Sequence, residues 1–298
     1  MDLQLNDAVN RMILSASGWR TIFAIDGNEE SSSPHISPAH KIIAAAAAKV
    51  FSDFLDTNAN FTGAVIVGRD TRPTGEAIAE AIISSLIASG REVRYVGIAA
   101  APEIMALARL AGGNSLFGDL SQEASSGANF IAAGFVYISA SHNPIGHNGI
   151  KFGLCDGGVL QAGDVAQLVT AFKSFMADAG RIEKAKILLE ENEKISSLAQ
   201  VYAEQDINKK AALTAYREFT NEVISGCKEK SKSEEFFDTL REGLKKQALG
   251  IAADFNGSAR TVSIDRDFFQ RVRARLPPPC RIDGDFRIGA QGRPDGAS

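Results

Sequence analysis

The sequence predicts an α/β protein in which a mainly parallel mixed sheet is sandwiched by helices. Three short apolar runs, rich in β-branched or aromatic residues, predict buried strands: 64–67, 93–97 and 135–138. Apolar residues at helical spacing precede and separate these runs: 42–55, 75–89 and 103–110. Alternating strands and helices of this length form βαβ units, whose sheet is covered on both faces.

Local signals justify each of these elements in turn. Ser37 followed by Pro38 is a favourable helix start, because Ser caps the helix and Pro fits the first helical position. Gly68 closes the first strand and Gly90 ends the second helix. Pro102 then opens the third helix, and the strand that ends at 138 follows a Gly-, Ser- and Asn-rich excursion over 113–129.

Beyond residue 153 the chain becomes mainly helical. Residues 164–177 form an amphipathic pattern, and the Lys- and Glu-rich stretch 181–226 predicts a solvated helical connection. We place a domain boundary near Ile207 to Lys210, so that residues 1–207 form the first domain and 208–298 begin a second α/β domain. Its predicted elements are helices over 214–225 and 234–246 and a strand over 249–253. Arg replaces Lys after Lys246, and Pro and Gly accumulate, which favours a mobile basic C-terminal tail.

Composition excludes several classes of protein. The chain has 298 residues, enough for two domains, with 45% hydrophobic and 23% charged residues. A net charge of −4 gives no support to binding of nucleic acid or a membrane surface. No apolar stretch approaches the roughly 18 residues of a spanning helix, and no leader pattern begins the chain. The isolated Cys155, Cys227 and Cys280 indicate thiols in a reducing compartment, so we expect a cytoplasmic protein. The sequence does not indicate how many copies of the chain associate.

The main chemical signal lies where the strand 135–138 ends in small and polar residues. Pro144 blocks helix continuation, so Ser141 lies just past the carboxyl end of a strand, where open α/β sheets place reactive groups. We expect His142, Asn143 and Lys151 to share one short loop with this serine. An imidazole, an amide and an ammonium group suit a serine that carries a phosphoryl group. A polar turn with a coincidental Ser–His pair is the alternative.

The segment resembles the active-site serine loop of the α-D-phosphohexomutases (phosphoglucomutase and phosphomannomutase), T-A-S-H-N-P followed by N-G-I-K. Ser139 replaces the leading Thr. The resemblance implies an isomerase of carbohydrate metabolism that interconverts hexose 1-phosphates and 6-phosphates through a phosphoserine at Ser141 and a bisphosphate sugar. It also implies general acid–base chemistry by Lys151 and orientation of the loop by His142, and the division of proton handling between these two residues stays open.

Two further motifs resemble the same family in the same order. Residues 17–20, Ser-Gly-Trp-Arg, are similar to S-G-x-R-G, although Thr21 replaces the final Gly. Residues 68–75 are similar to G-x-D-x-R-x-S with Thr74 for Ser. The resemblance implies that Arg20 stabilises the transferring group and that Asp70, Arg72 and Asn143 bind phosphate. The alternatives are a surface turn at Arg20 and a helix-capping Asp70 paired with an arginine.

The resemblance also implies Mg²⁺, bridged between the phosphate on Ser141 and three carboxylates of a second domain that this sequence lacks. Residues 283–287, Asp-Gly-Asp-Phe-Arg, supply too few carboxylates and are more similar to the family's D-G-x-F loop. Residues 254–259, Asp-Phe-Asn-Gly-Ser-Ala, resemble the turn at the start of the family's second domain, and we call them the Asp254 turn. We assign Asp254 to capping the next helix. We therefore expect an incomplete second domain, a fragment or shortened homologue with impaired turnover, and a hexose bisphosphate as its activator.

Other functions remain open on the sequence alone. A non-catalytic module that binds a phosphosugar or a partner protein would use the same residues. A Rossmann-type nucleotide binder is disfavoured, because no G-x-G-x-x-G follows a predicted strand. Trp19 is assigned either to shielding the phosphoserine or to the core or an interface, and His35 and His40 to the surface. The sequence does not distinguish glucose, mannose and glucosamine phosphates.

Overall fold

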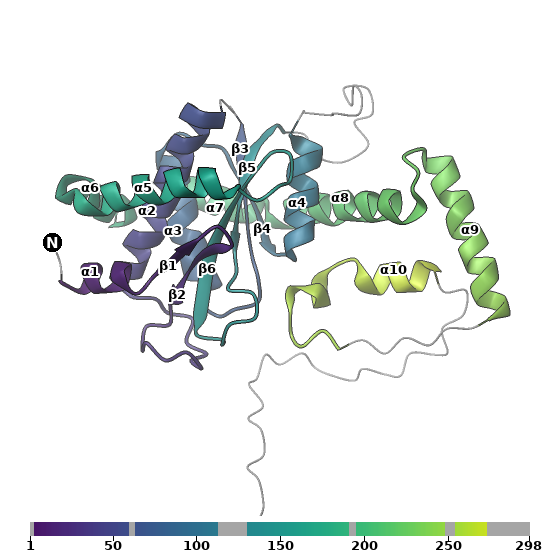
Figure 1. Cartoon of the computed structure of the whole chain (residues 1–298), viewed down its shortest axis with the longest axis horizontal. Coiled ribbons are helices and arrows are strands. Elements are labelled where there is room, and N and C mark those ends of the chain that lie inside the picture. Colours follow the sequence, from purple (N-terminus) through teal and green to yellow (C-terminus); the bar gives the residue numbers. More distant parts are fainter. Residues whose placement is uncertain (1–2, 60–62, 113–129, 191–194, 248–253, 273–298) are drawn as a thin grey trace, which may run out of the picture.

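A computed structural model describes residues 3–59, 63–112, 130–190, 195–247 and 254–272 (Figure 1). Its centre is a six-stranded mixed sheet in the order β1-β2-β6-β5-β3-β4. The strands are β1 Ile13–Ser15, β2 Gly18–Ile22, β3 Ala64–Arg69, β4 Val93–Ile98, β5 Ala132–Ile138 and β6 His147–Leu154. The prediction of an α/β fold with a mixed sheet between helices is confirmed.

Helices precede, cover and follow this sheet. The α-helices are α1 Leu3–Asn10, α2 Pro38–Phe54, α3 Gly75–Ala88, α4 Ala101–Ala111, α5 Ala162–Ala177, α6 Ala179–Glu190, α7 Ile195–Ala203, α8 Gln205–Ser225, α9 Lys230–Lys246 and α10 Asp265–Val272. A π-helical turn, Leu55–Ala59, extends α2, and a 3₁₀ turn, Ala259–Val262, precedes α10. None of the helices in the described parts of the chain is long and apolar enough to cross a membrane.

Successive residues of β3 face two separate cores, as a buried strand with side chains alternating across the sheet requires. Val65 and Val67 pack in a core with α2, α3, α5 and α6. Ile66 packs in the second core, beneath α4 and α8. The sheet is thus buried on both faces, which explains why its central strands are almost continuously apolar.

Two of the five strand pairs in the sheet are parallel and three are antiparallel. β3 pairs in parallel with β4 and β5, whereas β5 with β6, β6 with β2 and β2 with β1 are antiparallel. The expectation that Lys151 shares one short loop with Ser141 is wrong, because Lys151 lies within β6. Ile150 and Phe152 face one core while Lys151 points to the other side, the alternation of a strand.

The predicted start of α2 is confirmed, and it carries a histidine that is not at the surface as expected. Ser37 Oγ accepts a hydrogen bond from His40 N at 3.2 Å, with Pro38 at the first helical position. The His40 ring packs on Phe23 with centroids 5.0 Å apart. Burial lowers the pKa of His40 to about 4, so the ring is neutral at pH 7.

Helix α8 connects the sheet to the C-terminal helices. Its first half packs on α4 and β4 through Asn208, Ala211, Ala212 and Ala215. The boundary predicted near residue 207 falls inside this helix, and its position stays a prediction. α9 and α10 lie to one side of the sheet (Figure 1), where Phe237 contacts Phe268 and Arg271 pairs with Glu234.

Several predicted features lie outside the described residues. They are the excursion at 113–129, the strand at 249–253, Cys280, the segment 283–287 and the arginine-rich tail. Cys155 is buried and Cys227 is partly buried, and both are free thiols.

Candidate functional site

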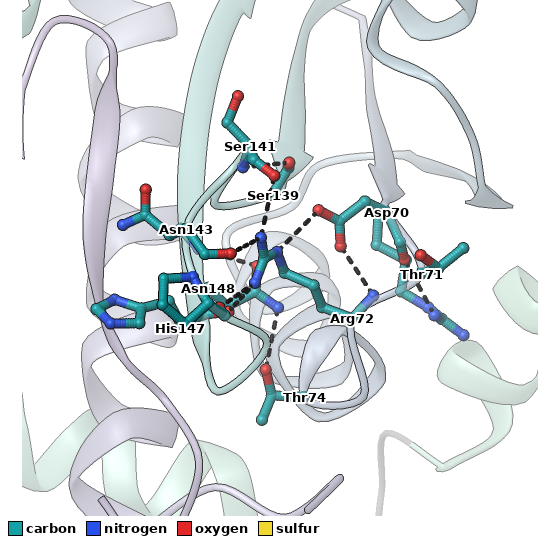
Figure 2. A network of polar contacts seen from close by, with 12 residues as sticks. Asp70, Thr71, Arg72, Thr74, Ser139, Ser141, Asn143, His147 and Asn148 are labelled. Atoms are coloured by element: carbon teal, nitrogen blue, oxygen red, sulfur yellow. Dashed lines mark hydrogen bonds and ion pairs between the residues drawn. The ribbon is translucent and has the colours of Figure 1, made fainter. Parts of the chain in front are cut away.

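The serine loop, residues 139–146, joins β5 to β6 at the carboxyl end of β5. Its first residue is tied to the next strand, because Ser139 N donates to Gly149 O at 2.9 Å. Ser141 is exposed and has a φ of 62°, a left-handed backbone that side chains other than Gly rarely adopt. Ser141 N donates to Ser139 Oγ at 3.0 Å. The Ser141 side chain points away from the polar network beneath it (Figure 2).

Beneath the serine loop lies the segment 70–74, which joins β3 to α3. Asp70 N donates to Ile138 O at 2.9 Å, and Asp70 Oδ1 accepts from Arg72 N at 3.0 Å. The Arg72 guanidinium reaches across to the serine loop (Figure 2). Its two Nη atoms donate to four backbone carbonyls, those of Ser141, Asn143, Pro144 and His147. The structure thus brings the two predicted motifs into direct contact at one edge of the sheet.

A buried amide that was not assigned a role from the sequence supports this contact. Asn148 Nδ2 donates to Thr74 Oγ1 at 3.0 Å, and Asn148 Oδ1 accepts from Gly149 N. Both side chains are fully buried. Asn148 therefore fixes the start of β6 against the start of α3. Its place in the N-G-I-K segment was the available signal.

Arg20 and Lys151 lie together on one face of the sheet. Arg20 pairs with Gly149 across β2 and β6, so Lys151, two residues along β6, is on the same face. Burial, and next the positive charge of Arg20, lower the pKa of Lys151, while the negative charge of Asp70 opposes them. Within the described residues neither cation pairs with a carboxylate, and Arg20 Nη2 donates to Ser17 O at 2.9 Å. Two neighbouring cations without a paired carboxylate suit an anionic ligand.

The side chains of His142, Asn143 and Trp19, which were also singled out from the sequence, lie outside the network around Arg72. His142 is exposed in the serine loop. The Asn143 side chain points away from Arg72 (Figure 2). Trp19 is wholly buried against Phe152 and Phe172, with ring centroids 5.1 and 4.8 Å away. Because successive strand residues face opposite sides, Trp19 lies on the far side of β2 from Arg20. Among the predicted positions for Trp19, the core is confirmed.

The Asp254 turn reaches the 70–74 segment, a contact that was not predicted. Thr71 Oγ1 donates to Gly257 O at 2.8 Å. Asp254 Oδ1 accepts from Asn256 N at 2.8 Å, so this carboxylate closes a turn. The expectation that Asp254 caps the next helix is wrong, because Ser258 holds the position before that 3₁₀ turn.

The described residues do not form a metal site. Among them, no group of three or more His, Cys, Asp or Glu side chains is arranged to hold a metal ion. Hard cations such as Mg²⁺ require clustered oxygen ligands. The described residues therefore do not fit a resident Mg²⁺ by themselves.

Residues 35–177 match the family model described as phosphoglucomutase/phosphomannomutase, alpha/beta/alpha domain I. This domain belongs to the phosphohexomutase family. The match runs from α2 through α5 and includes Asp70, Arg72, Ser141 and Lys151, whereas Arg20 precedes it. The fold and the serine loop of the phosphohexomutase domain are thus found together in one segment.

Two phosphoglucosamine mutases and one solved structure are similar to part of the chain. The chain is 32% identical over 133 residues to a phosphoglucosamine mutase of Frankia casuarinae, which covers 42% of the chain and 25% of that relative. It is 41% identical over 93 residues to a phosphoglucosamine mutase of Staphylococcus aureus, covering 31% of the chain and 16% of that relative. The matches therefore span a quarter or less of these relatives. A solved structure described as a putative phosphomannomutase from Thermus thermophilus aligns with a TM-score of 0.40 and 21% identity, covering 54% of the chain and 30% of that structure.

Proposed function

We propose that the phosphohexomutase domain of this chain performs the phosphoserine chemistry of a phosphosugar mutase. Ser141 would accept a phosphoryl group from a hexose bisphosphate and return it to a hexose monophosphate. The observation that carries the proposal is the exposed Ser141 on a left-handed backbone, held by the segment 70–74. A strained residue at the end of a central strand is typical of a functional site.

In the proposed step Ser141 Oγ attacks phosphorus, and the bond from phosphorus to the sugar oxygen breaks. The Oγ proton passes to a base, and the departing sugar oxygen takes up a proton. Such transfer depends mainly on positioning and on neutralising charge. Arg20 and protonated Lys151 provide positive charge, and the lowered pKa of Lys151 makes its neutral form more accessible as a base. His142 would orient the loop.

The proposed substrates are hexose phosphates. Glucosamine phosphates are the first to test, because two relatives are named phosphoglucosamine mutases; glucose and mannose phosphates are the comparison. We also propose a hexose bisphosphate as activator and Mg²⁺ bound through the phosphate on Ser141, with further ligands from outside the described residues. Free Cys155 and Cys227 support a cytoplasmic location.

The decisive experiment is incubation of the chain with glucosamine 1,6-bisphosphate or glucose 1,6-bisphosphate, followed by intact-mass measurement and phosphopeptide mapping. We expect a mass increase of one phosphoryl group, located on Ser141. Binding of the bisphosphate without transfer would instead support the non-catalytic phosphosugar-binding module. Phosphate on another residue contradicts the assignment of Ser141.

The affinity for a phosphate monoester should fall as pH rises through the pKa of Lys151. Below this pKa the ammonium attracts the anion, and above it the amine is neutral. Since burial and Arg20 lower the pKa from its ordinary value of 10.5, the loss should begin at lower pH than for an exposed lysine. Calorimetric titration with glucose 6-phosphate from about pH 7 upward checks this, because this ester has no amine and its phosphate charge is nearly constant there.

Lys151→Arg is the matched control, since arginine stays charged throughout this range. The variant should lose the pH dependence while it keeps affinity for the ester. An equal loss of affinity in both proteins would assign the titration to another group.

A further inference from the structure

We propose that Arg72 is a positioning residue that clamps the serine loop in the conformation that presents Ser141, and is not itself a phosphate ligand. This inference rests on the proposed role of Ser141. It replaces the phosphate-binding role that the sequence alone favours for Arg72. The evidence is that both Nη atoms of the guanidinium donate to carbonyls within the fold, while Nε is buried.

A guanidinium has five N–H donors in a fixed planar fork, four of them on the two Nη atoms. Nη1 donates to the carbonyls of Pro144 and His147, and Nη2 to those of Ser141 and Asn143. The remaining donor atom, Nε, makes no hydrogen bond; it is buried and lies 3.3 Å from Asp70 Oδ2 in an ion pair. A phosphate would have to displace a backbone carbonyl from one of the Nη atoms, because Nε is buried, so Arg72 has no accessible donor to spare.

The backbone carbonyls of the serine loop depend on the Arg72 guanidinium for their hydrogen bonds. Four carbonyl oxygens converge on one point, and carbonyl oxygens repel one another unless donors lie between them. The Arg72 side chain is only 10% exposed, so water has limited access to replace it. A single arginine therefore satisfies four acceptors that span the loop from Ser141 to His147.

The clamp also opposes the strain at Ser141. A left-handed backbone at a residue other than Gly persists only where surrounding contacts hold it. Arg72 binds the carbonyl of Ser141 itself, and Ser139 Oγ holds its N–H. Asp70 anchors the arrangement, because it binds Arg72 N and donates its own N–H to Ile138 at the end of β5.

The test uses the full chain with Arg72→Gln and Arg72→Lys. Hydrogen exchange is followed at the amides of Ser141, Asn143, Gly146 and His147, all of which are hydrogen-bonded. We expect at least about tenfold faster exchange in both variants, because Lys keeps the charge but lacks the planar fork. Exchange in β3 and α2 should stay at the wild-type rate.

Arg91→Gln is the matched control. Arg91 is 7% exposed and ties Ser52 and Asp56 to the start of β4, away from the serine loop. It should lower the thermal midpoint without selective exchange in residues 139–147. Guanidinium added to Arg72→Ala should restore part of the protection, which a general loss of folding would not allow.

A second measurement separates positioning from binding. Arg72→Lys should slow phosphorylation of Ser141 at least about tenfold while the affinity for glucosamine 6-phosphate stays near wild type; Arg20→Gln should reduce that affinity. Wild-type exchange rates in both Arg72 variants would overturn the clamp. So would a loss of ester affinity in Arg72→Lys as large as in Arg20→Gln. If wild type itself is not phosphorylated, the proposed function fails, and the exchange measurement still decides the clamp.

Discussion

Replacing Ser141 with alanine is expected to abolish phosphoryl acceptance while the domain stays folded. Alanine has no oxygen to form the phosphoserine, so the covalent route is lost and transfer should fall by about 10³-fold or more. The exposed side chain contributes little to packing. Transfer from the bisphosphate and thermal unfolding, measured on the same preparation, check both parts.

Ser141→Gly separates the chemistry from the backbone. Gly accepts a φ of 62° without strain, so this variant should be at least as stable as wild type and yet equally unable to accept phosphate. Ser139→Ala keeps the acceptor oxygen and loses only the contact to Ser141 N, and it should retain part of the activity. Phosphorylation of the alanine or glycine variant at position 141 at the wild-type rate would refute the phosphoserine mechanism.

Gly149→Ala is expected to destabilise the domain and disturb the site together. A Cβ at this position would lie 2.9 Å from the carbonyl oxygens of both Trp19 and Ser139, and 3.0 Å from Arg20 Cγ. Two of these neighbours are backbone atoms, one in β2 and one in the residue that follows β5, and they cannot move aside easily. Overpacking of this kind costs about 1–3 kcal/mol in the free energy of unfolding, which urea titration measures.

The same substitution at Gly163 is the control. Gly163 lies in α5, and a Cβ there would meet nothing within 4 Å. Alanine favours a helix over glycine by about 0.5–1 kcal/mol, so Gly163→Ala should leave stability unchanged or raise it. Equal stability of Gly149→Ala and wild type would show that β2 and β5 can separate without cost.

The parallel half of the fold is predictable from short sequence windows, and the antiparallel half is not. β3, β4 and β5 are apolar runs because both of their faces are buried, which leaves a local signal. β6 begins with His147, Asn148 and Gly149, which by themselves favour a turn. Its strand conformation comes from pairing with β5 on one side and β2 on the other.

The candidate site, too, is predictable from the sequence in part. Ser141, Asp70 and Arg72 could be assigned to one sheet edge, because each follows a predicted parallel strand. The partners of each donor could not be assigned, since the four carbonyls that Arg72 binds carry no side-chain signal. The contact between Thr71 and Gly257 joins residues 186 positions apart, beyond the reach of any local pattern.

The insertion of β6 between β2 and β5 sets an order of events during protein synthesis. Arg20 leaves the ribosome long before Gly149, its partner across β6. At about 5–20 residues per second, this separation corresponds to a delay on the order of ten seconds. Until then β1 and β2 have no sheet to join, and an unpaired hairpin of two short strands is marginal in water. Arg20 is thus synthesised early, but it meets Lys151, the other cation of the site, only when β6 has been made. Ribosome-bound chains that end before β6 should therefore leave β2 accessible to proteases and chaperones.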